Sequence, residues 1–120
     1  MKKMLFIEYP KCSTCKKAKK YLIDHQIDFE DRHIVENTPT KEELMEWIPK
    51  SKLPIKKFFN TSGNVYKEMK LKDKVNDFTL EETANLLSQN GMLIKRPLVI
   101  KDDLILVGFK ESEYEEFLLK

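Results

Sequence analysis

The sequence contains only two cysteines and two histidines, which restricts the metal sites that it can form. A structural zinc site needs four ligands, mostly of these two residue types. Cys12 and Cys15 form a single C-x-x-C pair, and no second pair is present to complete a site. His25 falls near the end of a predicted helix and His33 in a predicted strand, which is not the spacing of a zinc finger. We therefore expect no metal, and a redox thiol pair is favoured over half of a zinc site.

A long apolar run is also absent. The four apolar residues that follow Met1-Lys2-Lys3 are too few for the core of a signal peptide, and no stretch approaches the ~20 residues of a membrane span. We therefore expect a cytoplasmic protein without membrane contact. In the reducing cytosol a disulfide is more often transient, catalytic or sensing than structural.

Neither sign of charge is in clear excess. The 22 basic and 20 acidic side chains give a formal net charge of +2, and charged residues make up 35% of the chain, as in a well-solvated globular protein. So small a net charge does not indicate direct binding of nucleic acid. Internal repeats and low-complexity segments are absent, so residues 1–120 are expected to form one domain with a modest core of its own.

The cysteine pair lies where a predicted strand leads into a predicted helix. The apolar run Met4 to Ile7 predicts a strand buried on both faces, and the segment after the cysteines, to about Asp24, has the spacing of an amphipathic helix. A thiol at a helix N-terminus faces unpaired backbone N–H groups and the positive end of the helix dipole, and both favour the thiolate. We therefore predict that Cys12 is an exposed nucleophile with a pKa below that of a free cysteine. Cys15 is its neighbour one helical turn away and can close a disulfide, so it is interpreted as the resolving thiol.

The middle of the chain is predicted to form one more strand, followed by helices. Residues 27–35 partly alternate between apolar and polar, as a half-buried strand does, and complete a βαβ unit with parallel strands. The next helix is predicted to end at Pro49, and a later one at Asn90-Gly91, a pair that tolerates the left-handed conformation. Capping boxes predict three helix starts, at Thr40, Thr79 and Ser112.

Two β-rich runs, Pro97–Ile100 and Leu104–Val107, predict an antiparallel hairpin. The helix after it is expected to turn Tyr114, Phe117 and Leu118 inward. The predicted order is β-α-β, a helical insert at about residues 40–90, and β-β-α. This is the order of an α/β, thioredoxin-like (glutaredoxin-like) fold with a mixed four-stranded sheet.

Three motifs stand in a fixed order: Pro10 to Ala18 around the cysteines, Leu93 to Val99, and Val107 to Glu111. Together they resemble the arsenate reductase (ArsC) family and its Spx/MgsR-related branch, over nearly the whole chain. The resemblance implies a thioredoxin-like domain with a helical insert and Cys12 as the redox-active cysteine. It also implies a cis peptide bond before Pro97, with a strand-opening proline in trans as the alternative.

The resemblance further implies which groups would bind an oxyanion. Arg96 matches the family's arginine before the proline, and its planar guanidinium can donate two hydrogen bonds to an oxyanion or to the thiolate. Lys56 falls near a second family arginine, and Gly108 to Lys110 occupies the region of a third without supplying one. The remaining expected substrate-binding residues are Ser13, Thr14 and Pro97.

Two functions remain. The first is a thiol-dependent oxidoreductase resembling arsenate reductase, which acts on a small oxyanion or a thiol or disulfide substrate and needs no cofactor. Glutathione is its candidate reductant, and glutaredoxin or thioredoxin its candidate partner.

The alternative is an Spx-like redox-sensing transcriptional regulator that binds the RNA polymerase alpha subunit. Two residues depart from the pattern of the reductases. Glutathione- and glutaredoxin-linked reductases usually lack a cysteine at the position of Cys15, and Lys56 does not replace a bidentate arginine. These departures bear on arsenate reduction and leave thiol chemistry as the expectation. We favour the enzyme.

Overall fold

The computed structural model describes residues 4–119, and the Met1-Lys2-Lys3 segment considered above lies outside them. At its centre is a four-stranded sheet in the order β2-β1-β3-β4. β1 (Leu5–Glu8) runs parallel to β2 (Glu30–His33) and antiparallel to β3 (Leu98–Lys101), which pairs antiparallel with β4 (Leu104–Val107). The predicted mixed sheet, with its βαβ unit and its hairpin, is confirmed.

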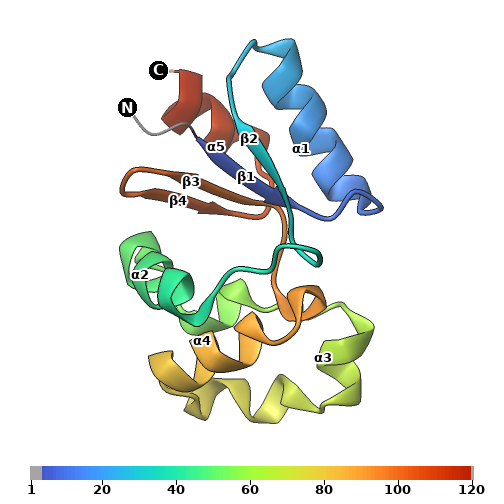
Figure 1. Cartoon of the computed structure of the whole chain (residues 1–120), viewed down its shortest axis with the longest axis vertical. Coiled ribbons are helices and arrows are strands. Elements are labelled where there is room, and N and C mark those ends of the chain that lie inside the picture. Colours follow the sequence, from blue (N-terminus) through green and yellow to red (C-terminus); the bar gives the residue numbers. More distant parts are fainter. Residues whose placement is uncertain (1–3, 120) are drawn as a thin grey trace.

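Helices cover both faces of this sheet (Figure 1). On one face lie α1 (Ser13–Asp24) and α5 (Glu111–Tyr114). The segment between β2 and β3 is helical and lies on the other face. It contains α2 (Lys41–Ser51), α3 (Asn64–Glu68) and α4 (Leu80–Ser88), together with short 3-10 turns at Ile55–Phe58, Leu71–Asp73, Val75–Asp77 and Gly91–Leu93.

Strand residues alternate between two hydrophobic cores, because successive side chains of a strand point to opposite faces of the sheet. In β1, Phe6 packs with α1 and α5, whereas Ile7 packs with the helical insert. The smaller core includes Ala18 and Leu22 of α1 and Tyr114 of α5. The larger core holds the buried residues of the insert, among them Leu44, Trp47, Phe58, Phe59, Ala84 and Leu87. Each face of the sheet is therefore covered by segments that are far apart in the sequence.

Two of the three predicted capping boxes are present. At the start of α2 the Thr40 hydroxyl accepts the N–H of Glu43 at 3.1 Å, and the Glu43 carboxylate accepts the N–H of Thr40 at 2.9 Å. Thr79 and Glu82 repeat this arrangement at the start of α4, with distances of 3.0 and 2.8 Å. These local sequence signals therefore fix where the two longer helices of the insert begin.

The third capping box, predicted at Ser112, is wrong. The Lys110 carbonyl accepts the N–H groups of Glu113 and Tyr114, so the helix begins before Ser112, which lies within its first turn and cannot cap it. A π-helical turn, Glu115–Leu119, follows α5. Because a π-helical turn contains more residues than an α-helical one, the inward positions are displaced. Phe117 is consequently 47% exposed, against prediction, whereas Tyr114 is fully buried and Leu118 packs on the smaller core.

The predicted end of α2 at Pro49 is also wrong, because the helix continues to Ser51. A proline in the last turn removes one backbone hydrogen bond without ending the helix. Trp47 and Ile48 anchor this turn in the larger core, and the Ser51 hydroxyl donates to the Ile48 carbonyl at 2.6 Å. The helix ends where Lys52 adopts the left-handed conformation, with φ of 60°.

Gly91 has a different role from the one predicted. Its φ is not positive, so the left-handed helix end expected at Asn90-Gly91 is absent. Instead, the chain passes very close to the segment that leaves β2. A Cβ on Gly91 would overlap the carbonyl oxygen of Ile34 and lie 3.1 Å from the Cα of Val35. Glycine is therefore required here for close packing of two backbone segments.

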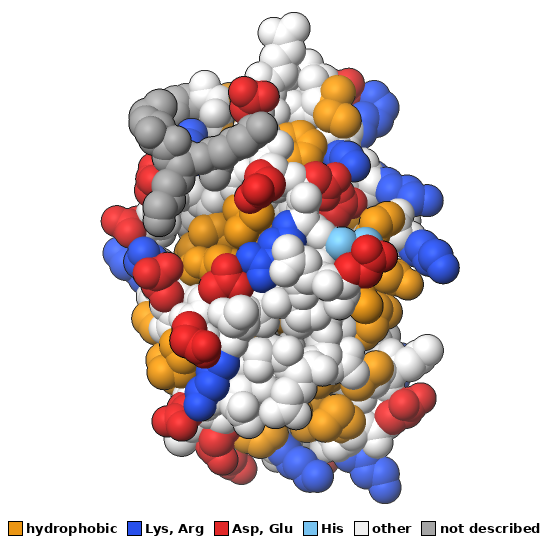
Figure 2. Space-filling model, in the orientation of Figure 1, with side chains coloured by type: hydrophobic (Ala, Val, Ile, Leu, Met, Phe, Trp, Pro, Cys, Tyr) orange, Lys and Arg blue, Asp and Glu red, His pale blue; other side chains and the backbone are white. Residues whose placement is uncertain are grey.

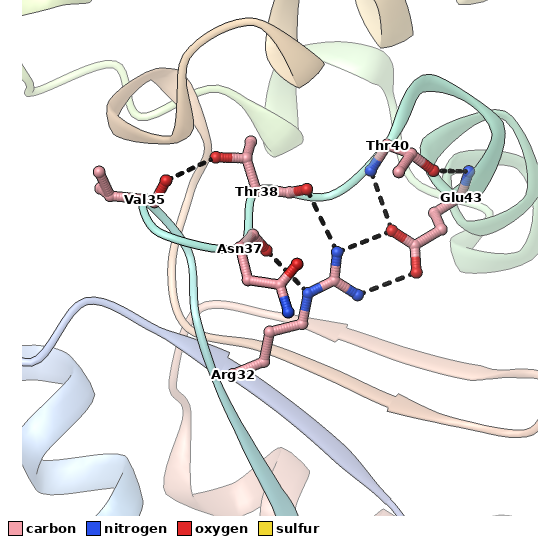
Figure 3. A network of polar contacts seen from close by, with 6 residues as sticks. All are labelled: Arg32, Val35, Asn37, Thr38, Thr40 and Glu43. Atoms are coloured by element: carbon pink, nitrogen blue, oxygen red, sulfur yellow. Dashed lines mark hydrogen bonds and ion pairs between the residues drawn. The ribbon is translucent and has the colours of Figure 1, made fainter.

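Arg32 on β2 ties the sheet to the start of α2 (Figure 3). Its side chain is 12% exposed, and its guanidinium donates two hydrogen bonds to the Glu43 carboxylate, at 2.8 and 2.9 Å. It also donates to the carbonyls of Asn37 and Thr38, at 2.8 and 3.2 Å. Hydrogen bonding from Arg32 holds the pKa of Glu43 below its usual range. Because Glu43 belongs to the capping box, one carboxylate both caps α2 and anchors it to the strand.

A second polar cluster joins β1, β2 and α1. Glu8 is 3% exposed, and the Lys19 ammonium lies 3.4 Å from its carboxylate and 2.6 Å from that of Asp31. Burial raises the pKa of Glu8 to about 7; hydrogen bonding to Asp31 and the Asp31 charge add to the rise, and Lys19 opposes it. Burial also acts to raise the pKa of Asp31, but hydrogen bonds with Glu8 and Lys19 bring it below its ordinary value. Of the two carboxyl groups, that of Glu8 therefore keeps its proton up to nearly neutral pH, whereas that of Asp31 is ionised.

We expect Glu8→Gln to stabilise the protein at pH 8 and to change its stability little at pH 4.5. The pKa of Glu8 is higher in the folded protein than its ordinary value of 4.5, so ionisation opposes folding. Ionisation of Glu8 therefore does not lower the free energy of unfolding below about pH 4.5, and its effect is fully present above about pH 7. The extra stability at the higher pH should be on the order of 2 kcal/mol, measured by urea unfolding. Glu30→Gln, at an exposed position of β2, is the control, and an equal effect of Glu8→Gln at both pH values would contradict the prediction.

Candidate active site

Cys12 and Cys15 lie at the turn between β1 and α1. Cys12 is the N-cap of α1: its N–H donates to the Tyr9 carbonyl at 2.9 Å, and its carbonyl accepts the N–H of Lys16 at 3.0 Å. Both cysteines are free thiols; Cys12 is half-buried, whereas Cys15, in the first turn of the helix, is fully buried. The turn therefore presents one accessible sulfur with a second, shielded sulfur behind it.

Hydrogen bonds favour the thiolate of Cys12. Burial by itself raises the pKa of Cys12, but hydrogen bonding from the backbone N–H and the thiol of Cys15 acts against burial. The guanidinium of Arg96 lowers the pKa further, through a hydrogen bond and through its charge, and the resulting pKa lies below the ordinary value. Cys12 thus has the surroundings of a reactive cysteine, with free N–H groups of a first helical turn and a fixed positive charge.

Cys15 has the opposite surroundings. Burial raises the pKa of Cys15 to about 12, and the neighbouring Cys12 adds to the rise, while a backbone hydrogen bond at Tyr9 and the charge of Arg96 oppose it. At neutral pH Cys15 is therefore a protonated thiol that can donate to the Cys12 sulfur. A pair with such divergent pKa values can divide the work of thiol exchange, one sulfur attacking and the other acting later.

Arg96 lies beside Cys12, just before β3. The peptide bond between Arg96 and Pro97 is cis, as the resemblance implied. The guanidinium carbon lies 5.1 Å from the centre of the Tyr9 ring, in a cation–π contact. The Nε and Nη1 atoms of Arg96 are buried and have no hydrogen-bond partner within residues 4–119. Because buried donors nearly always have partners, this guanidinium is equipped to receive an anionic group.

The other residues expected to bind substrate lie at different distances from the helix start. Ser13 and Thr14 are the first residues of α1, and both are exposed next to Cys12. Pro97 is buried, and its carbonyl accepts the N–H of Gly108 at 2.8 Å. The first two can therefore meet a ligand at the surface, whereas Pro97 lies beneath the surface.

Lys56 comes to this region from the helical insert. It is exposed on the 3-10 turn Ile55–Phe58. The end of this turn meets the segment that precedes Arg96, because the Phe58 carbonyl accepts the N–H of Lys95 at 2.8 Å. Within residues 4–119 Lys56 forms no ion pair. The structure thus brings the turn that carries Lys56 to the segment that precedes Arg96.

Sequence reasoning missed two tyrosines at this site. Tyr9 supports the Arg96 guanidinium and supplies a carbonyl to Cys12. Its position directly before the cysteine motif is a signal that could have identified it. Tyr114 is fully buried, and burial and then the charge of Cys15 raise its pKa. Tyr114 is remote from the cysteines in sequence, so only the fold reveals it.

Two hollows of the molecule lie away from the cysteine pair. One, of about 700 Å³, lies between α2 and the sheet and is lined by Trp47 and Ile100 among others. Another, of about 730 Å³, lies along β4 and is lined by Phe117 among others. Neither is lined by Cys12, Cys15 or Arg96. These two hollows therefore lie away from the candidate site.

The charges on the surface are mixed. On the face shown in Figure 2, acidic and basic side chains are interspersed.

Within residues 4–119, no group of three or more His, Cys, Asp or Glu side chains could hold a metal ion. The helices of this part of the chain are too short and too polar for any of them to span a membrane.

Comparison with known proteins gives the family. The profile described as ArsC family matches residues 7–117. The crystal structure of an ArsC family related protein from Bacteroides fragilis is 56% identical, with a TM-score of 0.92, covering 96% of this chain and 97% of that one. A protein from Streptococcus mutans UA159, described as a possible arsenate reductase, is 45% identical, with a TM-score of 0.88, covering 95% of this chain and 98% of that one. The regulatory protein MgsR of Bacillus subtilis is 30% identical over 92% of this chain and 86% of its own length. With a profile that spans nearly all of its residues and a relative that shares more than half of them, this chain belongs to the ArsC family.

Proposed function

We propose that the chain is a thiol-dependent oxidoreductase in which Cys12 is the nucleophile and Cys15 the resolving thiol. One observation carries the proposal: an N-cap sulfur of lowered pKa lies beside a guanidinium that has two buried N–H donors without partners. This pair suits a reaction in which a thiolate attacks while negative charge develops next to it. The substrate is a small oxyanion such as arsenate, or a disulfide, and the Streptococcus mutans relative supports the oxyanion.

With arsenate as substrate, the first step is attack by the Cys12 thiolate on arsenic. A sulfur–arsenic bond forms, and one arsenate oxygen takes up protons and leaves as water. Arg96 donates to the remaining oxygens, as a fork of parallel N–H groups can. Ser13 and Thr14 bind from the helix start and Lys56 from the insert, and Pro97 forms the wall beneath the substrate.

In the second step Cys15 attacks the Cys12 sulfur. The Cys12–Cys15 bond forms, and the sulfur–arsenic bond breaks with its electron pair passing to arsenic. Arsenic leaves as arsenite together with the proton of Cys15, so arsenic is reduced and the two thiols are oxidised. Glutathione, alone or through glutaredoxin, or thioredoxin then reduces the disulfide, and no bound cofactor takes part. A small thiol such as glutathione can also replace Cys15 in the attack.

We expect iodoacetamide to alkylate Cys12 well before Cys15 at pH 7. The expected ratio of rates is at least about tenfold, because the thiolate is the reactive species and Cys15 is both protonated and buried. A mild oxidant should join the two sulfurs within one chain. Mass spectrometry of peptides measures both results. Equal alkylation of the two thiols, or thiols that stay free after oxidation, would contradict the proposal.

The second candidate function is a redox-sensing regulator of RNA polymerase, and the similarity to MgsR supports it. In this case the same cysteine pair would act as a switch instead of a catalyst. An assay of arsenate reduction with glutathione and glutaredoxin, beside a binding assay with the C-terminal domain of the polymerase alpha subunit, separates the two. Turnover without binding selects the enzyme, and binding without turnover selects the regulator.

A further inference from the structure

Three side chains form a row at the end of the sheet where β1 and β2 end and β3 begins. β2, β1 and β3 are neighbouring strands; His33 is the last residue of β2, Tyr9 follows β1, and Arg96 comes just before β3. The Tyr9 ring lies edge-on to the His33 ring, with the centroids 5.9 Å apart. The guanidinium carbon of Arg96 lies over the same tyrosine, 5.1 Å from the centre of its ring. Tyr9 is therefore the middle member of the row and contacts both of the others.

His33 gives the Tyr9 ring a fixed neighbour. Its Nδ1 atom accepts the backbone N–H groups of Val35 and Glu36, both at 3.1 Å. In the neutral imidazole the proton therefore lies on Nε2, which is 3.6 Å from the Glu36 carboxylate. Because these contacts hold the imidazole on two sides, the Tyr9 ring packs against a side chain of defined orientation.

Tyr9 also contacts the residue that carries the nucleophile. Its carbonyl accepts the N–H of Cys12 at 2.9 Å, and its half-buried ring packs against the larger core. One residue thus touches Cys12 through its backbone and Arg96 through its ring.

The Arg96 guanidinium has few other contacts that could fix its direction. Its Nε and Nη1 atoms are buried without a hydrogen-bond partner, and no carboxylate within residues 4–119 forms an ion pair with it. A cation–π contact holds a guanidinium by its charge and leaves its N–H groups available to oxygen acceptors. The Tyr9 ring can therefore orient the two donors without occupying them.

We propose that Tyr9 is a positioning residue, which holds the Arg96 guanidinium so that its Nε and Nη1 donors receive an anionic group beside Cys12. This inference rests on the proposed function, because it takes Arg96 as the group that binds the anion. Tyr9 acts through Arg96 and does not touch the substrate. The arginine contacts the face of the ring, so the ring and not the hydroxyl carries the effect. With an aliphatic side chain at position 9 the guanidinium can turn away, and the preference of the site for anions is lost while Cys12 remains.

The test compares two reagents that alkylate Cys12 and differ in charge: iodoacetate, an anion, and iodoacetamide, which is neutral. Cys15→Ser is the parent, so that Cys12 is the only thiol of the chain. Both reagents react with the same thiolate, so the ratio of their rates does not depend on how much of Cys12 is ionised. Tyr9→Leu should lower the iodoacetate-to-iodoacetamide ratio about fivefold, and Arg96→Gln at least as much. Tyr9→Phe, which keeps the ring, should retain the ratio of the parent.

Tyr21→Leu is the matched control. Tyr21 is also a half-buried tyrosine, but it packs on the smaller core, so its loss should leave the ratio unchanged. Thermal unfolding shows that each variant is folded. If Tyr9→Leu does not fold, Tyr9→Met takes its place, because the longer and more adaptable side chain fills more of the space of the ring.

An unchanged ratio in Tyr9→Leu, beside a lowered ratio in Arg96→Gln, overturns the inference. An equal loss in Tyr9→Phe and Tyr9→Leu also overturns it, because the ring would then not be what holds Arg96. A ratio that Arg96→Gln does not lower would refute the role of Arg96 in the proposed function, and the inference with it. The labelling needs no turnover. A wild type that reduces neither arsenate nor disulfides would therefore refute the proposed enzyme, while the ratios would still decide the role of Tyr9.

Discussion

Replacing Cys12 by serine is expected to lower turnover of arsenate and of disulfides on the order of a thousandfold or more. Serine is close in size to cysteine, but its hydroxyl is not ionised near neutral pH, so no nucleophile remains beside Arg96. Cys12 is the N-cap of α1, and serine is among the best N-cap residues. The variant should therefore be at least as stable as the wild type, and thermal unfolding can show that the loss of turnover is chemical.

Cys15→Ser is the matched variant. It keeps the attacking sulfur, so the first step should proceed and glutathione should complete the second. We expect a smaller loss of turnover, together with a glutathione adduct on Cys12 that intact mass spectrometry detects. Turnover by Cys12→Ser at the wild-type rate would remove Cys12 as the nucleophile. A loss in Cys15→Ser as large as that in Cys12→Ser, with glutathione present, would show that a small thiol cannot replace Cys15.

Gly91→Ala is expected to destabilise the fold by about 3 kcal/mol or more, the largest structural effect of a single methyl group in this set. The new Cβ would overlap the Ile34 carbonyl oxygen and lie 2.9 Å from the carbon that bears it. These atoms belong to the backbone and cannot move unless the exit from β2 and the end of the insert separate. The loss should appear in urea unfolding as a lower midpoint with a similar slope.

Gly63→Ala is the control for this substitution. Its Cβ would also meet a neighbour, at 2.6 Å, but that neighbour is the end of the Asn60 side chain. A flexible side chain can rotate away, so we expect a loss below about 1 kcal/mol. Equal losses in the two variants would mean that crowding of the backbone at Gly91 is not what makes glycine necessary there.

The parts of the fold that could be predicted from the sequence are those with local causes. Thr40 and Thr79 cap their helices through residues only a few positions away, and short apolar, β-rich runs form β1, β3 and β4. The structural roles of Pro49 and Gly91 could not be predicted from their local sequence. Pro49 stays in its helix because the core holds the turn around it, and Gly91 is required by a backbone segment from another part of the chain.

The same distinction applies to the candidate site. The strand–turn–helix context was enough to predict the location of Cys12 and the direction of its pKa shift, because both depend on a helix start. Arg96 was identified only by resemblance to a family, since no local pattern links it to the cysteines. The raised pKa values of Glu8 and Tyr114 could not be predicted, because each arises where side chains from separate elements meet.

The division of the molecule into two cores also orders the events of its synthesis. The larger core can be completed once residue 105 has left the ribosome, whereas the smaller one also needs Tyr114 to cover Phe6 and Leu22. Domains acquire their packing as the necessary segments emerge, so the face of the sheet under α1 stays open until then. A nascent chain thus exposes Phe6 and Leu22, which the finished fold buries completely.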